Sequence, residues 1–110
     1  RAAAKELCDT FYVYMIRCDD DSLYCGYTTD LKRRFNEHKS GEKGAKYTRA
    51  HGAAAVAAAW TAYSRSAAMR LEAFLKKLKK TEKEELGSNP KILFEKYKDR
   101  FVEGEYNVSN

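Results

Sequence analysis

Four tyrosines lie close together near the start of this 110-residue chain, namely Tyr12, Tyr14, Tyr24 and Tyr27. Strands that only fill a core are usually rich in Val, Ile and Leu, so this number of phenols suggests a chemical role. A phenol can transfer a proton, but its ordinary pKa of about 10 makes it a poor base at neutral pH. Nearby positive charge or a second acceptor must therefore assist any tyrosine that acts as a base.

Two of these tyrosines are predicted to share one face of a β-hairpin. An acidic three-residue turn follows the strand-like segment 11–18 and joins it to a second strand. The register set by this turn places Tyr14 opposite Gly26. It places Tyr24 opposite Ile16, on the same face as Tyr14 and within reach of its ring. The missing side chain at Gly26 would let a ligand approach. Alternatively, the paired tyrosines are simply favourable sheet residues.

Three further side chains could add phosphate or metal chemistry to this face. Arg34 and His38 are four residues apart and share one face of a predicted helix. Glu72 falls at the edge of the apolar face of a second helix. Simpler explanations exist: Arg34 could belong to a surface ion pair, and His38 could be an ordinary residue at the edge of the core. Glu72 could pair with Lys76, which follows it by four positions.

The helix that carries Arg34 is expected to begin at an N-cap, Asp30, and to end before Gly41. Leu31 and Phe35 form its apolar face. The polar, basic residues 40–52 that follow indicate an exposed loop.

The alanine-rich segment 53–63 is ambiguous, because alanine favours helices whereas its Val, Trp and Tyr residues favour strands. We predict a strand, since two strands alone are only marginally stable. Apolar residues at helical spacing then predict the helix that carries Glu72, and these are Ala68, Leu71, Phe74, Leu75 and Leu78. Asn89 and Pro90 open a last helix, at about residues 90–101, with Leu93, Phe94, Tyr97 and Phe101 inward.

Length and composition favour one compact domain over residues 1–110, without a membrane span. Three cysteines without a CxxC pair, and only two histidines, argue against a disulfide framework or a zinc cluster. They favour a reducing compartment, the cytoplasm. Residues 30–80 contain 13 Lys or Arg against 4 acids. Such a basic block typically binds a polyanion, although a solvated lysine-rich surface would have the same composition.

Five short motifs in this order resemble the GIY-YIG nuclease superfamily, and in particular its small stand-alone bacterial members. They are YVYMI (12–16), YCG (24–26), TDLKRRFNEH (29–38), GAKYTRAH (44–51) and SAAMRLEAFLKKLKK (66–80). The resemblance covers roughly residues 11–80. It implies an α+β fold in the order β-β-α-β-α-α, with a small three-stranded antiparallel sheet flanked by helices.

The resemblance also implies a metal-dependent DNA endonuclease, with a role in DNA repair or recombination. Its implied catalytic residues are Tyr14, Tyr24, Arg34, His38 and Glu72. Glu72 would be the sole protein ligand of one divalent cation, Mg²⁺ or Mn²⁺. Activation of a phenol would fall to His38 or to metal-bound water. The lysines and arginines that would hold the DNA backbone are Lys43, Lys46, Arg49, Lys76 and Lys77.

Two other functions are compatible with the same residues. One is a non-catalytic nucleic-acid-binding module with the same fold, and a more distant one is a protein-interaction domain. The sequence leaves open whether a protein partner supplies specificity, and it leaves open the oligomeric state.

Overall fold

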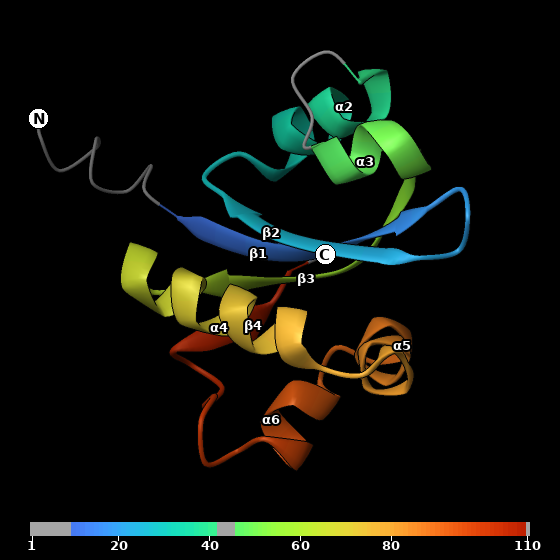
Figure 1. Ribbon diagram of the computed structural model, residues 1–110. Helices are drawn as coiled ribbons and strands as arrows, with labels where there is room; N and C mark the ends of the chain where they lie inside the picture. Colours follow the sequence, from blue (N-terminus) through green and yellow to red (C-terminus); the bar gives the residue numbers. More distant parts are fainter. Residues whose placement is uncertain (1–9, 42–45, 110) are drawn as a thin grey trace, which may run out of the picture.

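The computed structural model describes residues 10–41 and 46–109, which form a four-stranded antiparallel sheet with helices on both faces (Figure 1). The strands are β1 (Phe11–Cys18), β2 (Leu23–Thr28), β3 (Ala53–Ala62) and β4 (Tyr106–Val108), in the order β2-β1-β3-β4. One face carries α2 (Leu31–Ser40) and α3 (Lys46–His51). The other face carries α4 (Arg65–Lys77), α5 (Lys80–Ser88) and α6 (Ile92–Lys96). The expected α+β class is confirmed. No helix within the described ranges is both long and apolar enough to cross a membrane.

The β1–β2 hairpin has the register that its turn predicts. The Cys18 N–H donates to the Ser22 carbonyl at 2.8 Å, and Asp21 adopts a positive φ of 71°. Both features are typical of a three-residue hairpin loop. Tyr14 therefore lies opposite Gly26, as predicted.

Strand β1 lies between β2 and β3, and helices cover both of its faces. Val13 and Met15 belong to the larger core, beneath α4, α5 and α6. Tyr14 and Ile16 belong to a smaller core on the opposite face, beneath α2. Alternate residues of one strand thus serve two separate cores.

The alanine-rich segment forms β3, so the prediction of a strand is confirmed. It runs antiparallel to β1, with Ala62 opposite Phe11 and Ala53 opposite Cys18. Hydrogen bonding to β1 on one side and to β4 on the other outweighs the helical preference of alanine. Trp60 from this strand is fully buried in the larger core.

Two expectations about the rest of the chain are wrong in part. The segment 40–52 is not loop throughout, because residues 46–51 form the helix α3, and the side chain of Thr48 in this helix is buried. The sheet has four strands rather than three, because β4 pairs with β3. The side chain of Tyr106 in β4 is buried, and its hydroxyl donates to the Ala67 carbonyl at 3.0 Å.

The last predicted helix, at about residues 90–101, is also only partly correct. The helix α6 spans only Ile92–Lys96, and it follows α5, which the sequence did not predict. Pro90 precedes the helix instead of opening it, since Lys91 is the N-cap. The chain turns at Tyr97, where the Arg100 N–H donates to the Tyr97 carbonyl at 2.9 Å. This turn still buries Phe101 as predicted.

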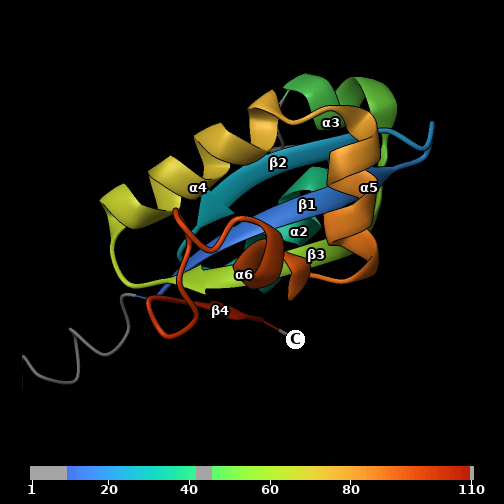
Figure 2. The same ribbon diagram turned by 90° about the horizontal axis from the view of Figure 1, so that it is seen from below.

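Strand β2 is an edge of the sheet, and this determines where the two helical layers can meet. Figure 2 shows α4 running alongside β2 on one face, while α2 lies on the other face. Side chains from α4 can therefore reach the α2 side of the sheet around β2.

Candidate active site

The Tyr14 ring lies directly over Gly26 on the neighbouring strand. A Cβ atom at Gly26 would lie 2.5 Å from the Tyr14 hydroxyl oxygen and 2.8 Å from its Cζ. The expectation that a ligand would use the space above Gly26 is therefore wrong, because the Tyr14 ring occupies it. Glycine is required here so that a large polar ring can lie across the strand.

His38 connects Tyr14 to a third residue, Thr48. The Tyr14 hydroxyl lies 2.9 Å from His38 Nε2, and His38 Nδ1 lies 2.7 Å from Thr48 Oγ1. All three side chains are buried, with His38 1% and Thr48 1% exposed. The helices α2 and α3 contribute His38 and Thr48, so the chain of hydrogen bonds crosses from the sheet into the helical layer.

Burial determines the protonation of Tyr14 and His38 in this hydrogen-bonded group. It raises the pKa of Tyr14 to about 12, with further raising by Tyr24 and by the Glu72 carboxylate, and it lowers the pKa of His38 to about 4. The phenol therefore keeps its proton and the imidazole is neutral. We assign the tautomer in which the phenol donates to His38 Nε2 and the imidazole donates from Nδ1 to Thr48; the two distances are compatible with this tautomer and with its reverse.

The buried neutral imidazole makes a testable prediction about stability. His38 has a pKa of about 4 in the folded protein and about 6.5 when unfolded, so the unfolded chain binds the extra proton first as the pH falls. The contribution of His38 is fully present above pH 6.5 and is lost as the pH falls towards 4. The loss should reach about 3 kcal/mol, since each pH unit between the two pKa values corresponds to about 1.4 kcal/mol.

Urea unfolding of the parent and of His38→Gln, at several pH values between 5 and 6.5, measures this effect. Most carboxylates remain ionised in that range, so His38 should account for most of the pH dependence of stability. The parent should therefore lose stability as the pH falls, and His38→Gln should lose much less. His51→Gln is the matched control, because the His51 side chain is 37% exposed. Parallel pH profiles for the parent and His38→Gln would contradict the assignment.

Arg34 places a positive charge beside the Tyr14 hydroxyl. By hydrogen bonding and by its charge it opposes the rise in the pKa of Tyr14, and its charge also helps to lower the pKa of His38. Its guanidinium Nη1 lies 2.8 Å from a Glu37 carboxylate oxygen. The Arg34 side chain is 28% exposed, so part of the guanidinium faces solvent while the rest faces the phenol.

Glu72 reaches the same region from α4, around the edge strand. Its charge makes a small contribution to the raised pKa values of Tyr14 and Cys25, so the carboxylate lies within electrostatic range of the hairpin. Its side chain is 21% exposed, and an oxygen lies 3.5 Å from Lys76 Nζ. The ion pair offered as the simpler explanation is therefore present.

The donor chemistry around Glu72 fits a hard, hydrated cation. The structure shows no group of three or more His, Cys, Asp or Glu side chains, among the residues it describes, that could enclose a metal. A single accessible carboxylate suits Mg²⁺, which keeps much of its water and is often held by one or two carboxylates together with substrate phosphate.

Tyr24 borders the site on its exposed side. Its ring centroid lies 5.3 Å from that of His38 and 5.7 Å from that of Tyr47. Tyr47 in turn stacks on His51 at 4.0 Å. The structure thus brings together all five candidate catalytic residues around β2. The stacked rings of Tyr47 and His51 from α3 lie beside them.

The predicted DNA-binding lysines separate into different places. Lys46 is exposed at the start of α3, and Lys76 lies 5.9 Å from the centroid of the Tyr24 ring. Lys77 instead lines a groove with Arg70 and Arg100, on the side of α4 that faces residues 97–101. Lys43 and the side chain of Arg49 lie outside the described part of the structure.

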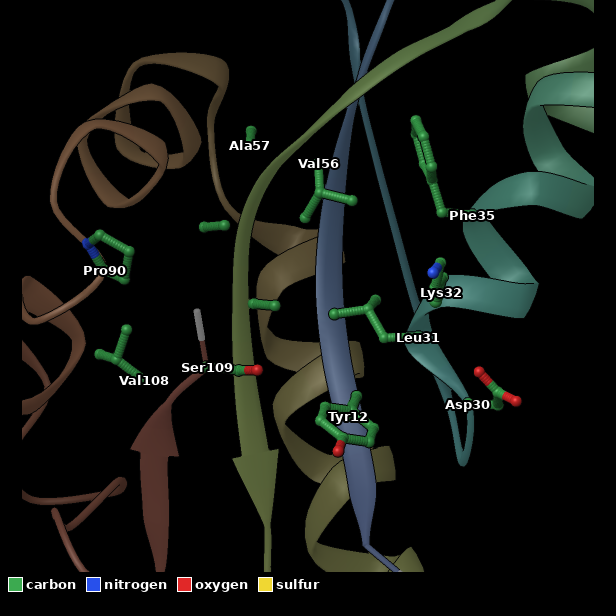
Figure 3. A pocket seen from close by; sticks show the side chains of 12 residues that line it. Tyr12, Asp30, Leu31, Lys32, Phe35, Val56, Ala57, Pro90, Val108 and Ser109 are labelled. Carbon is green, nitrogen blue, oxygen red and sulfur yellow. The ribbon is translucent and has the colours of Figure 1, made fainter.

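A cavity of about 760 Å³ lies elsewhere, between α2, β3 and β4 (Figure 3). Its walls are mostly apolar, from Leu31, Phe35, Val56 and Val108, with Tyr12 at one side. None of the five candidate catalytic residues is among the described residues that line it. The site is therefore a surface around β2 and not this cavity.

Sequence reasoning missed three residues of the site, Tyr47, Thr48 and His51, because it treated their segment as a loop. The signal was present, since Tyr47 and His51 are four residues apart and share one face of a short helix. Thr48 had no comparable signal, because its role depends on a contact with a distant helix.

Comparison with known proteins gives concordant matches. Residues 10–85 match the family model described as the GIY-YIG catalytic domain. The UPF0213 protein BH0048 of Halalkalibacterium halodurans is 49% identical over 77 residues, which are 70% of this chain and 81% of the relative. The UPF0213 protein FN1575 of Fusobacterium nucleatum is 42% identical over 80 residues, or 73% and 79% of the two chains. The solution NMR structure of BH0048 is 48% identical, covers 72% of this chain and 83% of that one, and superimposes with a TM-score of 0.47.

Proposed function

Because this chain belongs to the GIY-YIG family, whose members include nucleases, we propose that it is a metal-dependent DNA endonuclease that hydrolyses phosphodiester bonds. The observation that carries the proposal is the buried hydrogen bond of 2.9 Å between Tyr14 and His38, beside the charged groups of Arg34 and Glu72. A structural tyrosine needs one hydrogen-bond partner for its buried hydroxyl, which His38 provides, but not the guanidinium of Arg34 beside it or the charge of Glu72 within electrostatic range.

The Tyr14 phenol is the proposed proton acceptor for the attacking water. The water proton moves to the Tyr14 oxygen while the Tyr14 proton moves to His38 Nε2, so that no free tyrosinate is needed. The developing imidazolium keeps its Nδ1 hydrogen bond to Thr48. Thr48 thus acts as a positioning residue, because it keeps Nε2 available as the acceptor.

Arg34 is proposed to bind the scissile phosphate. Its planar fork can donate two hydrogen bonds to phosphate oxygens and stabilise the charge that develops as water attacks. Tyr24, at the exposed border, would orient the phosphate with its hydroxyl. Lys46 and Lys76 would hold the neighbouring backbone without reading sequence, and Lys43, Arg49 and Lys77 are proposed to extend that contact.

Glu72 would hold the divalent cation, which we propose to be Mg²⁺, with Mn²⁺ as a substitute. The bound ion would act as a Lewis acid and stabilise the leaving 3′ oxygen. Family membership supports the need for a divalent cation, since GIY-YIG nucleases generally use one. We further propose that the chain acts as one nuclease domain in the cytoplasm, in DNA repair or recombination.

Cleavage of plasmid and branched DNA by the purified protein tests this proposal. Nicking is expected with Mg²⁺ and not with EDTA, and binding in EDTA should weaken steeply with rising salt. Salt-dependent binding without cleavage under any metal would instead identify a non-catalytic DNA-binding module. Binding that does not change with salt would contradict both functions and favour a protein-interaction domain.

A further inference from the structure

An aromatic column extends from the candidate active site to the surface. The ring centroids of Tyr24 and Tyr47 are 5.7 Å apart with planes 24° from parallel, and those of Tyr47 and His51 are 4.0 Å apart at 23°. The first pair therefore overlaps less closely than the second. Tyr47 is 38% exposed, although most large apolar side chains of the described residues are buried or half-buried.

The column is held in place by the hairpin turn. His51 Nδ1 bonds to the Asp20 carboxylate, and the Asp19 N–H donates to the Gly52 carbonyl at 2.7 Å. These contacts fix the end of α3 against the turn. Tyr47 therefore presents a positioned ring, which costs little entropy to use in binding.

Positive charge lies beside the column. Lys76 Nζ is 5.9 Å from the Tyr24 ring centroid, and Lys46 is exposed one residue before Tyr47. Aromatic rings combined with adjacent cations are the features with which proteins bind unpaired nucleotides: the cations hold the phosphates and the rings stack on bases of any sequence.

We infer that Tyr47 stacks on an unpaired nucleobase next to the phosphate that is cleaved, so that the preferred substrate is single-stranded DNA or a junction with unpaired nucleotides. This inference rests on the proposed function. Because Tyr24 contacts both His38 and Tyr47, a phosphate at Tyr14 has its neighbouring base beside the column. A base within a duplex is already paired and stacked, and extruding it costs a few kcal/mol.

The test measures binding in EDTA, so that it does not depend on catalysis. Fluorescence anisotropy compares a single-stranded oligonucleotide with its duplex for the parent, Tyr47→Phe and Tyr47→Leu. Tyr47→Phe keeps the ring and should bind single strands like the parent. Tyr47→Leu should bind them about 5- to 150-fold more weakly, the range that corresponds to about 1–3 kcal/mol per stacked base. Its duplex affinity should change less than about twofold, since a paired base does not reach the ring.

Tyr63→Leu is the matched control, because Tyr63 is 58% exposed at the end of β3 and belongs to a different aromatic contact, with Tyr106. It should bind both DNAs like the parent. The fluorescence of Trp60, which is fully buried, reports whether each variant is folded.

Unchanged single-strand binding by Tyr47→Leu, or an equal loss for single strands and duplex, would overturn the inference. Its failure is distinguishable from failure of the proposed function. Tyr47-dependent binding of single strands without cleavage in Mg²⁺ would reject the nuclease and keep the inference. Cleavage of DNA by a protein whose binding does not depend on Tyr47 would do the reverse.

Discussion

Replacement of Glu72 by alanine is expected to abolish Mg²⁺-dependent cleavage while the protein stays folded. The loss should exceed about 10³-fold, because Lewis-acid stabilisation contributes several kcal/mol to the transition state and each 1.36 kcal/mol is a factor of ten. The folding cost should be at most about 0.5 kcal/mol, since the ion pair with Lys76 is a partly exposed pair on one helix. DNA affinity in EDTA should hold or increase, because a negative charge that faces phosphates is removed.

Two measurements are therefore made on the same variant, namely nicking in Mg²⁺ and DNA affinity in EDTA. Glu85→Ala is the matched control, since Glu85 also pairs with a lysine, Lys96, at 3.1 Å, but on α5. It should cleave like the parent. Retained cleavage by Glu72→Ala would reject the metal assignment and leave the ion pair with Lys76 as the role of this residue.

Tyr14→Phe should reduce cleavage by about 10² to 10⁴, the range typical of a general acid–base group. The phenylalanine ring still fills the space over Gly26, so packing is preserved. Loss of the hydroxyl leaves His38 Nε2 without the hydrogen bond from Tyr14, at a cost of about 1–3 kcal/mol of stability. Single-turnover cleavage rates and urea unfolding curves separate these two effects.

Tyr12→Phe controls for the loss of a hydroxyl from the same strand. Tyr12 lies two residues before Tyr14, is half-buried and lines the cavity between α2 and β3. Its replacement should leave the cleavage rate unchanged. A Tyr14→Phe variant that cleaves at the parent rate would exclude the phenol from proton transfer.

The arrangement of the hairpin was predictable because a short turn leaves few alternatives. A three-residue loop fixes which residues pair, and the period of two in a strand then fixes the face on which Tyr14 lies. The shared face of Arg34 and His38 followed from an equally local rule. These are properties that residues near in sequence determine among themselves. The strand at 53–62 is different, because alanine favours a helix and the strand was expected from the marginal stability of two strands alone.

Contacts between distant segments were not predictable in this way. The helix α3 has only six residues, so the four-residue spacing of Tyr47 and His51 is a signal too short to distinguish a helix from a loop. The bond from His38 to Thr48 exists because α3 packs against α2, and the sequence does not contain that distance. The space above Gly26 is filled by the Tyr14 ring and not by a ligand, and this likewise depends on the rotamer of Tyr14, a residue of the neighbouring strand.

The position of β2 at the edge of the sheet has a consequence for how activity and unfolding are related. Tyr14 and His38 belong to the layer beneath α2, whereas Glu72 belongs to α4 in the opposite layer. Local opening of either layer alone would separate the phenol from the carboxylate. In the proposed mechanism, a partly unfolded molecule therefore cannot cut DNA, so the cooperativity of folding also limits cleavage to intact molecules.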